Sequence, residues 1–150
     1  MSNVTLNRTL DATQSQVWAV LADFPNIADW NSGIKKSYST NDSIDGVGAM
    51  RHCDLAPLGS LKETVVGWTP EEQMVISIDS AAKLPIKGGQ MTFTLARAGE
   101  STDFTMSYDY TANGRPFKGL VAKILQGQLR KGFNGFIDDL EPAAKSQPVG

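Results

Sequence analysis

The sequence predicts a single-domain α+β protein in which a curved antiparallel sheet of about seven strands wraps around a long C-terminal helix. Between residues 3 and 111, short runs of alternating polar and apolar side chains are joined by turn residues, a pattern typical of hairpin-linked antiparallel strands. From residue 116 onward, apolar side chains recur at a spacing near 3.6, which indicates a helix. Only this helix is long enough to cover one face of the sheet, so we expect the opposite face to be wet.

The chain opens with an expected strand and a capped helix. Apolar and polar side chains alternate over residues 3–10, which predicts the strand. Either Asp11 or Thr13 can cap the following helix, and Gln16 stands at the capping-box position relative to Thr13. An apolar face then predicts a helix that runs through about Ala22.

A second short helix and the remaining strands follow. Pro25 ends the first helix, and residues 26–29 are expected to form the second. Residues 81–89 are interpreted as a loop because they contain Pro85, Gly88 and Gly89. The expected strands are residues 34–40, 48–55, 60–69, 73–80, 90–97 and 102–111.

The long helix is predicted over residues 116–140. Pro116 suits its first turn, where the missing N–H is least costly. Gly119, Gly127, Gly132 and Gly135 cost about 1 kcal/mol each relative to Ala, so they indicate close packing or a bend. We expect a domain of residues 1–141 and a flexible tail of residues 142–150.

The composition disfavours several classes of function. The 14 Lys and Arg residues and 16 Asp and Glu residues give a net charge of −2, which argues against a nucleic-acid binder. One Cys and one His exclude an intrachain disulfide and a Cys-rich zinc site, and nothing calls for a metal or cofactor. Without a signal peptide or an apolar span, we expect a cytoplasmic protein rather than an integral membrane protein. Whether it is a monomer or a homodimer stays open.

Nearly the whole chain resembles one superfamily in the order and spacing of its motifs. They are Leu10-Asp11-Ala12, Val17-Trp18, Leu21-Ala22-Asp23-Phe24 and Trp30, then Gly46-Val47-Gly48-Ala49-Met50-Arg51 and Gly59-Ser60-Leu61-Lys62-Glu63, before the long helix. They resemble the START-like, helix-grip superfamily (SRPBCC), in its polyketide cyclase/dehydrase branch. One fold hosts unrelated activities, so the resemblance is specific for fold and not for function.

The resemblance implies a deep cavity between sheet and helix that takes a hydrophobic or amphipathic small molecule. Related members place an Arg and a Glu in this cavity, at the positions of Arg51 and Glu63. Residues 56–59 resemble a gate loop, and residues 83–85 stand where a second entrance loop lies. The resemblance favours Lys35 as an inward side chain whereas strand parity favours Lys36, and a solvated lysine is the simpler interpretation of either.

Strand parity gives an independent indication of the same cavity. Arg51 shares a strand face with the apolar Cys53 and Leu55, while His52 lies on the other face. On the next strand Glu63 shares a face with Leu61 and Val65. Charges that face an apolar interior need a partner, so we expect Arg51 and Glu63 to pair. The pair belongs either to a ligand pocket or to a structural ion pair near the sheet rim.

The expected cavity lining extends over the sheet and the helix. On the central strands, alternating apolar residues share a parity that turns them toward the helix, and the Tyr108 hydroxyl can orient a ligand. The candidate ligand-binding residues are Arg51, Cys53, Leu55, Leu61, Glu63, Val65, Ile76, Ile78, Phe93, Met106, Tyr108, Val121 and Ile124.

Three functions fit these features. The first is a carrier or ligand-binding protein for a hydrophobic small molecule, which needs only a cavity and an entrance. The second is a polyketide cyclase- or dehydratase-like enzyme, with Glu63 as general base and Arg51 as oxyanion stabiliser. The third is a protein-interaction module, which would have an exposed apolar patch and a filled cavity. The first is favoured because no specific catalytic signature is present.

Overall fold

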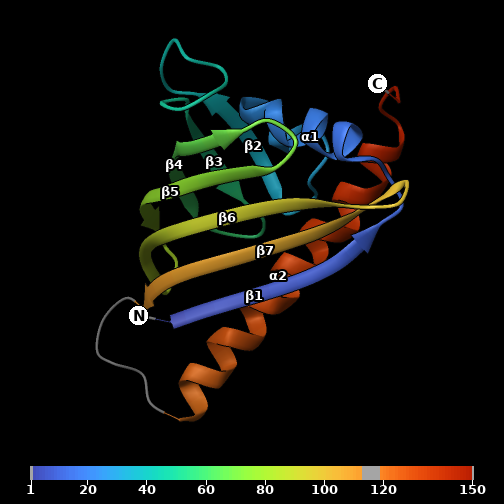
Figure 1. Cartoon of the computed structure of the whole chain (residues 1–150). Coiled ribbons are helices and arrows are strands. Elements are labelled where there is room, and N and C mark those ends of the chain that lie inside the picture. The colour runs from blue at the N-terminus through green and yellow to red at the C-terminus, as the bar shows by residue number, and fades with distance from the viewer. Residues whose placement is uncertain (1, 113–118, 150) are drawn as a thin grey trace.

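A computed structural model of the chain describes residues 2–112 and 119–149, without the side chains of residues 112 and 121. One antiparallel sheet of seven strands, in the order β1-β7-β6-β5-β4-β3-β2, curves around the helix α2 (Figure 1). This arrangement confirms the predicted α+β helix-grip fold. The elements are β1 (Ser2–Leu10), α1 (Gln14–Ala22), η1 (Phe24–Asp29), β2 (Ile34–Ser39), β3 (Met50–Leu55), β4 (Ser60–Thr69), β5 (Gln73–Ala82), β6 (Ile86–Ala98), β7 (Ser101–Ala112) and α2 (Leu120–Lys145).

The start of α1 has the predicted capping box. The Thr13 hydroxyl accepts a hydrogen bond from the Gln16 N–H at 3.1 Å, and the Gln16 side chain accepts one from the Thr13 N–H at 2.9 Å. Asp11, the alternative cap, has another role. Its N–H donates to Glu141 at 2.8 Å and its carboxylate lies 3.1 Å from the Lys145 Nζ, so it holds the end of α2.

The core lies where the C-terminal half of α2 meets the sheet and α1. Leu10, Phe104, Ile137 and Leu140 are fully buried there. The opposite face of the sheet is polar, as predicted. On that face Asn3 donates to Ser107 and Asp109, whose side chains lie across the β1–β7 pairing. Since the polar face is exposed, the interior of the molecule is confined to the space between sheet and helix.

The predicted loop at residues 81–89 was wrong at both ends, because β5 continues to Ala82 and β6 begins at Ile86. Gly88 and Gly89 lie within β6, each with φ of 138°. A Cβ on Gly89 would lie 2.1 Å from the Asp109 carbonyl oxygen, so only glycine permits this close approach of β7. The two glycines therefore mark an irregular stretch of a strand, where pairing with β7 shifts register.

The helix α2 also ends later than predicted. Its expected start at Pro116 lies outside the described residues, but the helix runs past residue 140, through Pro142, to Lys145. Ala144 is fully buried and the Gln147 carbonyl accepts a hydrogen bond from Gln16. These contacts hold residues 144 and 147, which lie in the segment that the sequence assigned to a flexible tail. Neither of the described α-helices combines the length and the apolar character needed to cross a membrane.

Candidate functional site

A cavity of about 470 Å³ lies between the concave face of the sheet and α2. Most of its lining is aliphatic or aromatic. From α2, Leu125, Leu129 and Phe133 line it, and Gly132 leaves room because nothing lies within 4 Å of where its Cβ would be. The candidate residues that line it are Arg51, Leu55, Leu61, Glu63, Ile76, Ile78, Phe93, Met106 and Tyr108.

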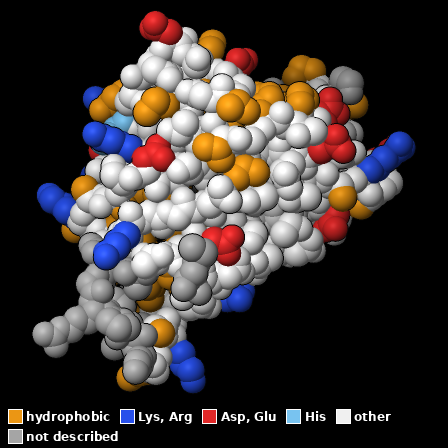
Figure 2. Space-filling model, turned by 60° about the vertical axis from the view of Figure 1, so that its left-hand side comes forward, with side chains coloured by type: hydrophobic (Ala, Val, Ile, Leu, Met, Phe, Trp, Pro, Cys, Tyr) orange, Lys and Arg blue, Asp and Glu red, His pale blue; other side chains and the backbone are white. Residues whose placement is uncertain are grey.

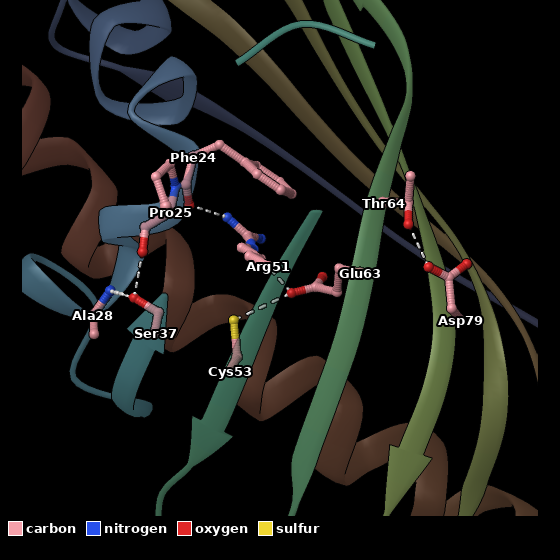
Figure 3. A network of polar contacts seen from close by, with 9 residues as sticks. All are labelled: Phe24, Pro25, Ala28, Ser37, Arg51, Cys53, Glu63, Thr64 and Asp79. Atoms are coloured by element: carbon pink, nitrogen blue, oxygen red, sulfur yellow. Dashed lines mark hydrogen bonds and ion pairs between the residues drawn. The ribbon is translucent and has the colours of Figure 1, made fainter. Parts of the chain in front are cut away.

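Arg51 and Glu63 form a buried ion pair in this lining. Antiparallel pairing of β3 and β4 sets the two residues opposite each other. The Arg51 Nε donates to Glu63 Oε1 at 3.0 Å, and the two residues are 5% and 6% exposed (Figure 3). This is the pairing that an apolar surrounding requires, because an isolated buried charge is strongly unfavourable.

The short helix η1 fixes the guanidinium of Arg51 from the other side. Its Nη1 donates to the Phe24 carbonyl at 2.8 Å, and its Cζ lies 3.9 Å from the centre of the Phe24 ring. The Ser37 hydroxyl donates to the Pro25 carbonyl at 2.8 Å and accepts from the Ala28 N–H at 3.0 Å, which ties η1 to β2 (Figure 3). Arg51 is therefore held in one orientation by hydrogen bonds and ring stacking.

Two polar atoms of the pair stay available to a ligand. Among the described residues, neither Nη2 of Arg51 nor Oε2 of Glu63 has a hydrogen-bond partner. Both side chains line the cavity. The site thus offers one charged donor and one charged acceptor next to an apolar wall, which can orient a polar group of a bound molecule.

Cys53 contacts Glu63 of the ion pair but does not line the cavity. Its thiol donates to Glu63 Oε1 at 3.3 Å and is fully buried. Burial, and then the negative charge of Glu63, raise the pKa of this thiol far above its usual range. A thiol that stays protonated is a weak nucleophile, so Cys53 acts here as a small hydrogen-bond donor.

The Tyr108 hydroxyl is hydrogen-bonded within the protein. The hydroxyl donates to the Gly88 carbonyl at 2.7 Å, and the residue is 2% exposed. Burial, followed by the charge of Glu63, raises the pKa of this phenol well above its usual range. Tyr108 can therefore present only its oxygen lone pairs to a ligand, because its proton is already used.

Two other candidates, Val65 and Ile124, have different surroundings from those expected. Val65 is fully buried in the core and does not line the cavity, and the side chain of Val121 lies outside the described residues. Ile124 is 52% exposed, whereas the next residue, Leu125, is buried and lines the cavity. Successive helix positions differ by about 100°, so the error lies in the helical phase of this turn.

Side chains on the outer face of the sheet are separate from the cavity. His52 stacks on Tyr38 with ring centres 5.0 Å apart, and its Nε2 lies 2.9 Å from Asp54. Lys35 and Lys36 are both exposed, and neither lines the main cavity. Within the described parts of the chain, no group of three His, Cys, Asp or Glu side chains could hold a metal ion.

Two neighbouring loops contribute to the lining of the cavity. Residues 56–58 line it from one loop, and Leu84 and Pro85 line it from the other. Gly59 has φ of 101°, and a Cβ there would lie 2.8 Å from the Leu84 side chain. Glycine at this position therefore lets the two loops touch.

Asn31 is a lining residue that the sequence did not single out. It is 4% exposed, and its Oδ1 accepts a hydrogen bond from the Gly33 N–H at 3.0 Å. Its Nδ2 is buried without a hydrogen-bond partner among the described residues. The only signal in the sequence was the turn pattern Asn31-Ser32-Gly33, which gives no indication of what the side chain faces.

Comparison with known proteins gives a family match and a set of similar structures. Residues 1–141 match the family model described as polyketide cyclase/dehydrase and lipid transport. No curated protein sequence matches the chain.

Three solved structures illustrate the shared fold. A protein from Thermus thermophilus is 14% identical, with a TM-score of 0.81 over 97% of this chain and 98% of that one. The Zhui aromatase/cyclase from a Streptomyces species is 16% identical, with a TM-score of 0.79 over 96% and 93%. A START superfamily protein from Mycobacterium smegmatis is 15% identical, with a TM-score of 0.75 over 93% and 97%. At such identities the likeness concerns the fold alone.

Proposed function

Since the chain belongs to the polyketide cyclase/dehydrase and lipid transport family, we propose that it binds a hydrophobic or amphipathic small molecule between the sheet and α2, as a carrier or ligand-binding protein. The observation that supports this most directly is the cavity of about 470 Å³ with its mostly apolar lining. Small-molecule sites have volumes of about 300–1,000 Å³ and combine apolar walls with a few fixed polar groups.

The two walls of the cavity suit different parts of such a ligand. Ile76, Phe93 and Met106 offer apolar area, and each Å² removed from water contributes about 25 cal/mol. The Arg51–Glu63 pair offers directional hydrogen bonds to one polar group. A molecule with a greasy body and a single oxygen function near the pair would satisfy both walls.

A fluorescence titration with N-phenyl-1-naphthylamine, a neutral apolar probe, tests this proposal. Leu129→Trp puts an indole into the cavity, whereas Ile124→Trp adds the same group on the exposed side of the same helix. We expect saturable binding to the unmodified chain and to Ile124→Trp, and a loss of about tenfold or more in affinity for Leu129→Trp. Binding that Leu129→Trp leaves unchanged would overturn the proposal.

A second function, cyclase- or dehydratase-like catalysis, is favoured by the ion pair. Glu63 would take a proton from a carbon next to a ligand carbonyl, and the Arg51 Nη2 would donate to the oxygen that becomes an enolate. Its test is turnover of an aromatic polyketide thioester mimic. Glu63→Gln should abolish turnover while it leaves apolar probe binding in place; turnover that survives Glu63→Gln excludes Glu63 as the base.

The remaining expectations stay predictions. An interaction module would have a filled cavity, so the open volume gives that alternative no support. A cytoplasmic location and a monomeric or homodimeric state are still to be tested by fractionation and by light scattering.

A further inference from the structure

A second, smaller hollow of about 290 Å³ lies beside the loop of residues 56–59. Leu58 lines both hollows, so its side chain lies at the boundary between the two spaces. Gly59 and Lys83 also line the smaller hollow, and their chain neighbours Leu58 and Leu84 line the main cavity. A molecule that lies in the main cavity and extends past Leu58 would reach the smaller hollow.

The charge around this smaller hollow is positive. Lys35, Lys36 and Lys83 line it together with a single carboxylate, that of Asp54. Asp54 already pairs with His52 at 2.9 Å. Within residues 2–112 and 119–149, none of the three lysines has a carboxylate within 4.0 Å.

This local excess of positive charge contrasts with the rest of the molecule. The chain as a whole carries a net charge of −2, so a positive hollow does not follow from its composition. In the view of Figure 2, Lys and Arg side chains gather on one side of the surface, beside hydrophobic side chains. Lysines that are not neutralised by the protein itself attract an anion.

The turn between β5 and β6 fixes the backbone conformation of Lys83. Lys83 has φ of 59°, a left-handed conformation that is unfavourable for a residue with a Cβ. Such strain persists where the surroundings fix the backbone. The close contact between Gly59 and Leu84 provides that constraint.

We propose that the hollow of Lys35, Lys36 and Lys83 binds the anionic end of the ligand whose apolar body occupies the main cavity. The ligand class is thus an amphipathic organic anion with a carboxylate, sulfonate or phosphate end group. This inference rests on the proposed function, because it requires the main cavity to hold the apolar part.

Two probes that share one scaffold test the charge. N-phenyl-1-naphthylamine is neutral, and 8-anilino-1-naphthalenesulfonate is the same ring system with a sulfonate. The double variant Lys36→Gln/Lys83→Gln should weaken binding of the sulfonate by about fivefold or more and change binding of the neutral probe less than about twofold. Added salt should weaken only the sulfonate. Lys131→Gln, an exposed lysine of α2, is the matched control and should change neither.

The outcomes separate this inference from the function on which it rests. If neither probe binds the unmodified chain, the proposed function fails as well. If the neutral probe binds but the double variant leaves the sulfonate unaffected, only the present inference is overturned. An equal loss of both probes also contradicts it, whereas retention of sulfonate binding in Lys83→Arg supports a role of charge.

Competition experiments identify the end group. Displacement of the sulfonate probe by decanoate or decyl phosphate, and far less by decanol, would support the inference, and the stronger competitor names the anion. Equal displacement by decanol would contradict it, because an uncharged head would then bind as well as a charged one.

Discussion

The two walls of the cavity differ in how their side chains are held. On β3 and β4, Arg51 and Glu63 are fixed by hydrogen bonds to each other and to the Phe24 carbonyl. On β6 and β7, Phe93 and Met106 are held by packing alone, with Phe93 stacked on Phe136 at 5.4 Å between ring centres. Packing is not directional but hydrogen bonds are, so under the proposed function the first wall would set the orientation of a ligand and the second its size and shape.

The largest expected effect comes from breaking the charged wall. Arg51→Met leaves Glu63 buried without its partner, which should lower the free energy of unfolding by about 3–5 kcal/mol. Urea denaturation followed by circular dichroism measures this. The double variant Arg51→Met/Glu63→Leu should recover most of the loss, because it removes both charges. A single variant within about 1 kcal/mol of the unmodified chain would contradict a buried, structurally coupled pair.

The apolar wall should respond less, and in a different way. Met106→Ala removes a side chain that is 2% exposed and enlarges a space that already exists, so we expect a loss of about 2 kcal/mol. In contrast to changes in the charged wall, it should let the cavity accept larger neutral probes. Unchanged selectivity between naphthyl and anthracenyl probes would argue against the role of this wall in setting size.

Tyr108 lies on β7, in the apolar wall, but carries a polar hydroxyl group. Tyr108→Phe removes the hydrogen bond to the Gly88 carbonyl and should cost about 1 kcal/mol of stability. Thermal unfolding of Tyr108→Phe and of the unmodified chain measures this loss of stability. A larger loss in ligand affinity than in stability would show that the phenol oxygen also contacts the ligand.

The smallest effect is a dependence of stability on alkaline pH. Burial raises the pKa of Cys53 and of Tyr108 in the folded chain. In the unfolded chain the thiol ionises at about pH 8.5 and the phenol at about pH 10. Above these values the unfolded chain therefore binds fewer protons than the folded chain. The free energy of unfolding should thus fall as the pH rises above about 8.5.

One variant tests whether Cys53 causes the first part of this fall in the free energy of unfolding. Cys53→Ala should flatten the decline between about pH 8.5 and 10 and leave the steeper part above it. A thiol-specific reagent should also react with the folded chain far more slowly than with the unfolded chain. Rapid reaction of the folded chain would show that Cys53 is not the buried, protonated thiol described above.

Sequence reasoning predicted the elements better than it predicted their ends. Alternation on β3 and β4 placed Arg51 and Glu63 on the inner face because a strand has a period of two, which leaves little ambiguity. Gly88 and Gly89 were interpreted as loop residues, since the need for glycine arose from the approach of β7, which is distant in sequence. Local patterns cannot show such a contact.

The helix and the turns limited the prediction of the site. An apolar stripe on α2 is wide enough to include Ile124 and Leu125, and only packing decides which of them faces the cavity. Asn31 was missed because its position depends on how the turn after η1 folds against the cavity. The hollow at Lys83 was missed because it is assembled from segments that are separate in the sequence.

The most direct test of ligand binding between the sheet and α2 uses the methionine methyl groups. Met91 and Met106 line the cavity, Met74 is buried without lining it, and Met50 is 36% exposed on the outer face. Methyl NMR spectra of chain labelled at methionine, titrated with N-phenyl-1-naphthylamine, report on all four. The account predicts saturable shifts of the Met91 and Met106 signals with Met50 and Met74 unchanged. Shifts confined to Met50, or no shifts at saturating probe, would contradict it.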